Sequence, residues 1–145
     1  MSALLANKPL LGPLVGLNLW TFGIEFLLYK RRIPALAQYN VTFDPETVKK
    51  QKEEKLPGFV KWPADNFNNL LEQPTQFYAV ILGLSLMNVK DKRTVGVAWA
   101  YVGLRMLHSI IHVSTNNPSI RFPVWAASSL ALFGITVQAA WTLFF

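Results

Sequence analysis

The last segment of the chain, Phe122–Phe145, reads FPVWAASSLALFGITVQAAWTLFF and contains no charged residue. A stretch of this length can cross the hydrocarbon core of a bilayer, which takes about 20 residues of α-helix. Three further apolar stretches precede it, and we expect helices over 10–29, 67–89 and 94–114. The sequence therefore predicts an all-α membrane protein in which four transmembrane helices form an up-down bundle.

The composition agrees with this class. The chain has 145 residues, enough for a single domain over 1–145, and 15% of them are charged. Soluble domains carry about a quarter. The net charge is +6, and because most basic residues lie between the apolar segments, we attribute it to a membrane surface rather than to nucleic acid. The absence of cysteine excludes disulfides, cysteine metal ligands and a protein thiol nucleophile.

One connection is much longer than the others and covers 30–66. Its prolines and charged residues predict a mostly non-helical stretch over 33–63. A short helix is expected over 45–54, with Asp44 as its N-cap and Pro45 as its first residue. The first apolar segment is too long for a cleavable signal and ends without a small-residue cleavage site, so we expect it to remain as a signal anchor.

The distribution of lysine and arginine predicts an orientation. The first and third loops carry nine of these residues, against four on the opposite side. The positive-inside rule therefore places both loops in the cytoplasm or its equivalent and both termini on the other side. The organelle stays open between an endomembrane, a mitochondrial membrane and a bacterial inner membrane.

Polar residues within the predicted helices are functional candidates, because they are costly inside a membrane. Their spacing places them on single helix faces. They are Asn69, Glu72 and Gln76 on the second helix, and Tyr101, Arg105, His108 and His112 on the third. In an up-down bundle both groups lie toward the first loop, together with Glu25, Lys30–Arg32 and Arg121. The sequence thus predicts a cationic pocket on the cytoplasmic side, suited to an anionic, amide-bearing or zwitterionic ligand.

Several of these residues also have purely structural interpretations. Glu72 and Arg105 could form a buried ion pair between two helices. His108 and His112, four residues apart, could bind a metal, although neither an H-E-x-x-H motif nor a third carboxylate ligand accompanies them. Lys30–Arg32 could be an interfacial anchor, with the tryptophans as belt or packing residues.

Small residues mark expected helix-packing faces. They are Gly96, Ala100 and Gly103 on the third helix, and Ala127, Ala131 and Gly134 on the fourth. Because four helices of this size enclose little space, we expect a ligand site between subunits. Arg121, which precedes the fourth segment, could also simply extend its side chain to the membrane surface.

Three motifs in the second half of the chain resemble those of the MAPEG family, the membrane-associated proteins of eicosanoid and glutathione metabolism. They are NLLE at 69–72 with Pro74 after it, RMLH at 105–108 with His112 after it, and Pro118 followed by Arg121. The three motifs occur in the family's order on a four-span chain of this length. The chain is therefore similar to microsomal glutathione transferases in layout and in motifs.

The resemblance implies a homotrimer that binds glutathione, as a cosubstrate, between neighbouring subunits. The glutathione-binding residues it implies are Arg31, Arg32, Asn69, Glu72, Arg105, His108 and His112, and it implies no metal. It also makes Arg121 the catalytic residue, because a nearby guanidinium favours the thiolate over the thiol. The thiolate would then attack a lipophilic electrophile that arrives from the membrane.

The chain departs from the family pattern at four positions. Asp65 and Asn68 stand where many members carry an arginine, and His112 stands where a tyrosine is usual. Phe122 replaces the hydroxyl residue of prostaglandin-type members. These differences remove some of the family's glutathione contacts and argue against prostaglandin isomerase activity.

Two functions follow from these observations. The first is a membrane-embedded glutathione-dependent transferase or peroxidase, with membrane lipids and a lipophilic small molecule as its partners. The alternative is a non-catalytic subunit of a larger membrane complex, favoured by the missing arginines and by the long charged loop. A proton or ion pathway through Glu25, Glu72 and the histidines is a weaker third idea, because the opposite leaflet lacks polar groups.

Overall fold

The structure is a computed structural model that describes residues 7–145. It is helical, and no strand occurs in this range. The helices are α2 (Leu11–Gln38), α3 (Val48–Lys55), α4 (Gly58–Glu72), α5 (Pro74–Leu86), α6 (Lys92–Ser114) and α7 (Pro118–Phe144). The all-α class predicted from the sequence is confirmed.

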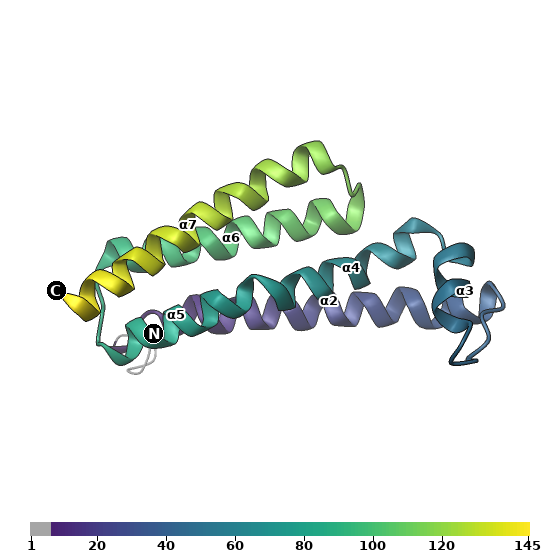
Figure 1. The fold of residues 1–145 in the computed structure, drawn as a ribbon, viewed down its shortest axis with the longest axis horizontal. Coiled ribbons are helices and arrows are strands. Elements are labelled where there is room, and N and C mark those ends of the chain that lie inside the picture. The colour runs from purple at the N-terminus through teal and green to yellow at the C-terminus, as the bar shows by residue number, and fades with distance from the viewer. Residues whose placement is uncertain (1–6) are drawn as a thin grey trace.

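The helices form two antiparallel pairs that lie against each other (Figure 1). α2 packs most extensively on α4, and α6 on α7. α5 continues roughly along the line of α4, while the short α3 lies beyond the end of the first pair (Figure 1). The C-terminus lies at the same end as the first described residues, so the chain runs up and down through four rods of helix.

Three of the helices, α2, α6 and α7, are long and apolar enough to cross a membrane. They correspond to three of the four predicted segments. The fourth segment, expected as one helix over 67–89, is divided between α4 and α5. With 15 and 13 residues, neither is long enough to cross a bilayer alone.

Pro74 explains the division of the second segment. Proline has no N–H to donate, and its ring crowds the carbonyl four residues earlier, which is that of Leu70. Gln73 nevertheless keeps helical angles, with φ −61° and ψ −39°. The result is a kink between two helices rather than a loop.

The non-helical stretch expected over 33–63 is wrong at both of its ends. α2 continues through Pro34 to Gln38, and α4 begins at Gly58 and contains Pro63. Pro63 leaves the carbonyl of Phe59 without its usual helical donor, and Arg31 Nη1 donates to that oxygen at 3.0 Å. A hydrogen bond from a distant part of the chain thus satisfies a carbonyl that proline would otherwise leave without a donor.

The short helix expected over 45–54 is α3, which begins later, at Val48, and ends at Lys55. Asp44 instead organises the turn that precedes it. Its carboxylate accepts hydrogen bonds from the Thr47 hydroxyl (2.6 Å) and the Glu46 N–H (3.4 Å). These bonds, with that from Thr47 the stronger, hold the pKa of Asp44 below its usual value.

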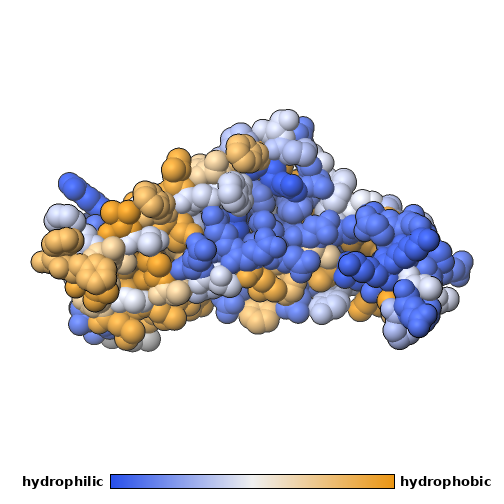
Figure 2. Space-filling model, viewed as in Figure 1, coloured by the Kyte–Doolittle hydropathy of each residue, from blue (hydrophilic) through white to orange (hydrophobic). Residues whose placement is uncertain are grey.

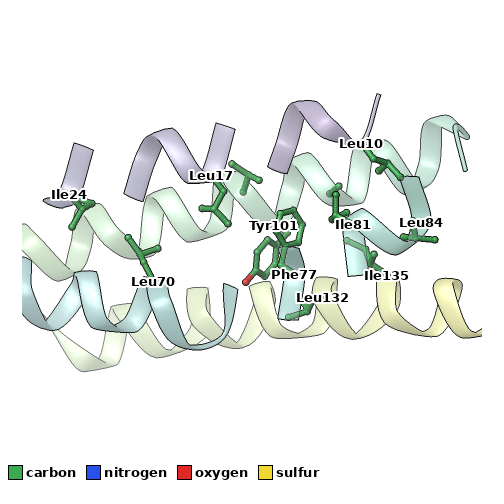
Figure 3. Packing of buried hydrophobic residues seen from close by; sticks show 12 residues of the cluster. Leu10, Leu17, Ile24, Leu70, Phe77, Ile81, Leu84, Tyr101, Leu132 and Ile135 are labelled. Carbon is green, nitrogen blue, oxygen red and sulfur yellow. The ribbon is translucent and has the colours of Figure 1, made fainter. Parts of the chain in front are cut away.

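A hydrophobic cluster joins the two pairs (Figure 3). At its centre the rings of Phe77 and Tyr101 stack with centroids 4.3 Å apart, and Leu17 and Leu132 belong to the same cluster. Because lipid is as apolar as these side chains, close packing rather than escape from water holds such helices together.

The glycines of the predicted small-residue faces take no part in close packing within the protomer. A Cβ atom added at Gly96, Gly103 or Gly134 would meet no neighbouring atom within 4 Å. The close approach occurs instead at Gly16, where a Cβ would lie 3.2 Å from the Trp99 ring. Ala131 of the predicted face on α7 does pack against the hydrophobic cluster, so inside one chain the prediction of packing faces is wrong for the three glycines only.

The surface is divided along the long axis of the molecule. On the face seen in Figure 2, hydrophobic residues cover the end that carries the C-terminus. Hydrophilic residues cover the middle and the end that carries α3. The polar residues thus gather toward one end, as the spacing of the sequence predicted.

Candidate functional site

The turn between α6 and α7 sets the position of Arg121. The N–H groups of Thr115 and Asn116 both donate to the Ile111 carbonyl, at 3.1 and 2.8 Å, which closes the end of α6. The Asn117 side chain then accepts from the Ser119 N–H at 3.0 Å and caps α7. α7 therefore begins before the predicted residue 122, and Arg121 lies within the helix rather than ahead of it.

A cavity of about 370 Å³ opens beside this turn, between α4, α6 and α7. Its volume falls within the range of small-molecule sites. Its lining residues are Asn69, His108, His112, Pro118, Arg121, Phe122 and Trp125. The structure thus brings together four of the residues singled out in the sequence: Asn69, His108, His112 and Arg121.

Asn69 and the two histidines carry buried polar atoms that lack partners. Asn69 Oδ1 and the Nδ1 atoms of His108 and His112 make no hydrogen bond to any residue of 7–145. Buried polar groups are costly unless a ligand or water satisfies them. The two rings meet edge to face at 5.7 Å, and the described chain brings no group of three histidine or acidic side chains together for a metal.

Arg121 is half-buried and held by a neutral group. Its Nη1 donates to the side-chain oxygen of Asn116. No carboxylate within the described part of the chain lies within 4.0 Å of its guanidinium, since the ion pairs found there are Lys50–Glu54 and Lys61–Glu53. The positive charge is therefore uncompensated and would favour an anion in the cavity.

Arg105 lies behind the cavity and does not line it. Its side chain is completely buried, and Nη2 donates to the Asn69 carbonyl at 3.1 Å. This oxygen belongs to the last turn of α4, where a cation interacts favourably with the helix dipole. Glu72 is exposed, and within residues 7–145 it forms no ion pair with Arg105, so the buried ion-pair interpretation is wrong.

Neither Arg31 nor Arg32 lines the cavity. Arg31 Nη1 donates to the carbonyl of Phe59 and, at 3.1 Å, to that of Val113. It lies in a second groove, of about 310 Å³, that Ile110 and Val113 also line. Ile110 follows His108 by two residues, which is roughly half a turn round the helix. A single protomer therefore does not bring Arg31 or Arg32 to the cavity.

Two residues of the site were missed in the sequence. Asn116, which holds the Arg121 side chain, stands in the triplet Asn116-Asn117-Pro118, a recognisable helix end and helix start. Trp125 was assigned to packing but lines the cavity. For Asn116 a signal existed, because asparagine is one of the few residues that readily adopts left-handed angles at a helix end.

Apolar helices long enough to cross a bilayer define an integral membrane protein, and its polar cavity is bordered by a cation without a carboxylate partner within residues 7–145. A comparison with protein-family models matches the MAPEG family over residues 10–141, nearly the whole chain. The chain therefore belongs to the MAPEG family, and the resemblance of its motifs is confirmed. This membership supports a membrane function related to glutathione or eicosanoid metabolism. Comparisons with curated proteins and with solved structures gave no significant match.

Proposed function

We propose that this protein is a membrane-embedded glutathione-dependent transferase or peroxidase that acts on lipophilic electrophiles. The observation that carries the proposal is the Arg121 guanidinium, which adjoins the cavity with only a neutral hydrogen-bond partner. A cation kept free of carboxylates is the group that an ionised thiol requires.

The polar residues of the cavity fit the peptide part of glutathione. The unpartnered atoms of Asn69, His108 and His112 can exchange hydrogen bonds with its amides. Glutathione also carries two carboxylates, and Arg121 is the only cation among the lining residues. Arg31 lies in a groove on another face of α6, and Arg32 does not line the cavity, so in this proposal a neighbouring subunit brings both cations to the ligand.

A homotrimer is the assembly that we propose for this purpose. Gly96 and Gly103 support it, because they are exposed on α6 with open space around them. Small residues on an exposed helix face allow a helix of another subunit to pack closely. The mass of the detergent-solubilised protein is expected to be that of three protomers. A stable monomer would contradict this part of the proposal.

The fourth crossing of the membrane would be made by α4 and α5 together, in a single membrane domain. Their residues from 58 to 86 follow one kinked path, because Gln73 between them keeps helical angles. At 1.5 Å per residue this path is about 43 Å long, enough for a bilayer core of about 30 Å. The loops that follow α2 and α6 would then share the cytoplasmic side.

Glutathione supplies a thiol, whose sulfur, once ionised, forms a bond to an electrophilic carbon and displaces a leaving group with its electron pair. Arg121 stabilises the negative charge on that sulfur. A free thiol has a pKa of about 8.5, and lowering it by about two units makes the anion the main form at pH 7. Phe122 and Trp125 form the apolar wall of the cavity against which a lipophilic electrophile would pack.

The test compares Arg121→Ala with Arg93→Ala, since Arg93 borders a different cavity at the opposite end of α6. Purified protein in lipid nanodiscs is assayed for glutathione affinity by calorimetry and for conjugation of a chloronitrobenzene. We expect Arg121→Ala to lower conjugation about 100-fold, the size typical of removing one charge-stabilising group, with a smaller loss of affinity. Arg93→Ala should behave as the wild type, and no binding at millimolar glutathione would overturn the proposal.

One observation favours the alternative of a non-catalytic subunit. The segment around α3 lies beyond the end of the helix pairs (Figure 1), and Phe43 within it is 76% exposed. A large aromatic side chain on a charged projection is a typical contact point for another protein. Constant co-purification with another membrane protein, together with an absence of conjugating activity, would support this function instead.

A further inference from the structure

Asn116 lies in the turn between α6 and α7 and has a left-handed backbone, with φ of 50°. Asn40 and Asn88 have the same backbone form, with φ of 48° and 60°, and they follow α2 and α5. Glycine adopts this conformation more easily than asparagine. The backbone therefore does not explain why residue 116 is an asparagine.

The side chain of Asn116 gives a reason for an asparagine at this position. Its oxygen accepts the hydrogen bond from Arg121 Nη1. The rest of the turn fixes the two partners, because the Asn116 N–H is bonded to Ile111 and the Arg121 N–H donates to the Asn117 carbonyl at 3.0 Å. Backbone hydrogen bonds thus anchor both residues whose side chains make this contact.

The chemistry of this acceptor matters as much as its position. A carboxylate at residue 116 would also bind the guanidinium, and more strongly. It would, however, cancel the positive charge that an anion in the cavity needs. An amide oxygen orients the guanidinium and leaves its charge intact.

We propose that Asn116 is a positioning residue that directs the Arg121 guanidinium toward the cavity without neutralising it. The inference rests on the role proposed above for Arg121. It assigns to Asn116 an effect on thiol ionisation rather than on glutathione affinity, since Asn116 is not among the residues that line the cavity.

Three variants test the proposal in the full-length protein in liposomes. Asn116→Gly keeps the left-handed backbone and removes the acceptor, while Asn116→Asp keeps an acceptor and adds a charge. The matched control is Asn40→Gly, because Asn40 is exposed and its side chain makes no hydrogen bond within residues 7–145. Glycine suits both positions, so loss of folding would not explain a difference between the two glycine variants.

The first measurement needs no glutathione. Solid-state nitrogen NMR reports how fast each guanidinium rotates, and the Arg121 signal is assigned by its loss in Arg121→Lys. We expect a slowly rotating Arg121 guanidinium in the wild type, in Asn116→Asp and in Asn40→Gly. In Asn116→Gly the rotation should become fast. A signal that is unchanged in Asn116→Gly, or equally altered in Asn40→Gly, would overturn the proposal.

The second measurement follows the ultraviolet absorbance of the glutathione thiolate during a pH titration of the complex. Asn116→Gly should raise the pKa of the bound thiol by about one unit, which means about tenfold less thiolate well below that pKa. Asn116→Asp should suppress the thiolate at least as strongly although its guanidinium stays ordered. KM for glutathione should change less than threefold in Asn116→Gly.

The two measurements separate this inference from the proposed function. If wild-type protein forms no thiolate while Asn116→Gly still releases the Arg121 guanidinium, the transferase is wrong and the positioning by Asn116 stands. If the wild type forms thiolate and Asn116→Gly titrates identically, the transferase stands and the role of Asn116 is wrong.

Discussion

The two turns at the ends of α6 are built alike and yet differ in charge. In the α5–α6 turn a left-handed asparagine, Asn88, is followed by Asp91, whose carboxylate accepts from the Thr94 N–H at 2.8 Å. In the α6–α7 turn a left-handed Asn116 is followed by Asn117, whose amide oxygen caps α7 in the same way. Both turns therefore end one helix with a left-handed asparagine and start the next with a side-chain cap.

The cations at the two turns have different surroundings. At the first turn, Lys8 Nζ donates to the Asn88 side chain at 2.5 Å and to the Ser85 carbonyl at 2.8 Å. A carboxylate, Asp91, stands two residues before Arg93, which borders a cavity of about 220 Å³. At the second turn the side-chain amide oxygen of Asn117 caps α7, that of Asn116 accepts from Arg121, and Arg121 borders the larger cavity. Neither Arg93 nor Arg121 forms an ion pair within residues 7–145, but only the first turn places a carboxylate cap near its arginine.

The largest effect is expected when the second turn is given the charge of the first. Aspartate caps a helix as well as asparagine, so Asn117→Asp should leave the stability within about 0.5 kcal/mol of the wild type. The new carboxylate lies one helical turn before Arg121, within reach of its guanidinium. We expect thiolate formation and conjugation to fall about tenfold, equivalent to a rise of about one unit in the thiol pKa.

The reverse exchange serves as the control for that experiment. Asp91→Asn removes the carboxylate from the first turn and should leave conjugation unchanged. Thermal unfolding in detergent is measured on both variants to exclude a loss of folded protein. Full activity in Asn117→Asp would show that the neutrality of the second turn has no bearing on Arg121.

The sequence predicted what depends on local composition. Apolar runs located α2, α6 and α7, and helical spacing placed His108 and His112 on one face, where the structure has them lining one cavity. Asn69 and Arg121 join them there because the up-down order of the helices brings their ends together. Each of these inferences needs only hydrophobicity, helix periodicity and chain direction.

What the sequence could not predict depends on contacts between distant residues. Pro63 was taken as a helix boundary, because nothing local reveals that Arg31 would supply a donor to the Phe59 carbonyl. Arg105 was predicted to line the pocket, but its side chain donates to the Asn69 carbonyl and is buried behind the residues that line the cavity. In both cases an arginine donates to a backbone oxygen at a helix end or kink. The sequence of a single segment does not reveal that this oxygen accepts a hydrogen bond from a distant residue.

A second prediction concerns stability at the first turn. Asp91→Ala removes the acceptor of the Thr94 N–H and leaves an exposed end of α6 without its cap. Loss of such a cap costs about 1 kcal/mol, so thermal unfolding in detergent should occur roughly 4 °C lower. Conjugation by the remaining folded protein should be unchanged, and a loss of activity would mean that the two turns are not independent.

The smallest effect expected is a dependence of this cap on pH, which the amide-capped turn cannot have. The hydrogen bonds from Thr94, the backbone N–H first, hold the pKa of Asp91 below its usual value, which is about 3.9 in an unfolded chain. A depressed pKa contributes stability that is fully present above the unfolded value and is lost as the pH falls through the folded value.

Between pH 7 and about pH 5 the free energies of unfolding of the wild type and Asp91→Asn should therefore differ by a constant amount. Below about pH 4 the wild type should lose more stability than Asp91→Asn, because an asparagine cap keeps its acceptor at every pH. Parallel unfolding curves for the two proteins down to pH 3 would contradict a charged cap at the first turn, and would remove the difference in charge that distinguishes it from the turn beside Arg121.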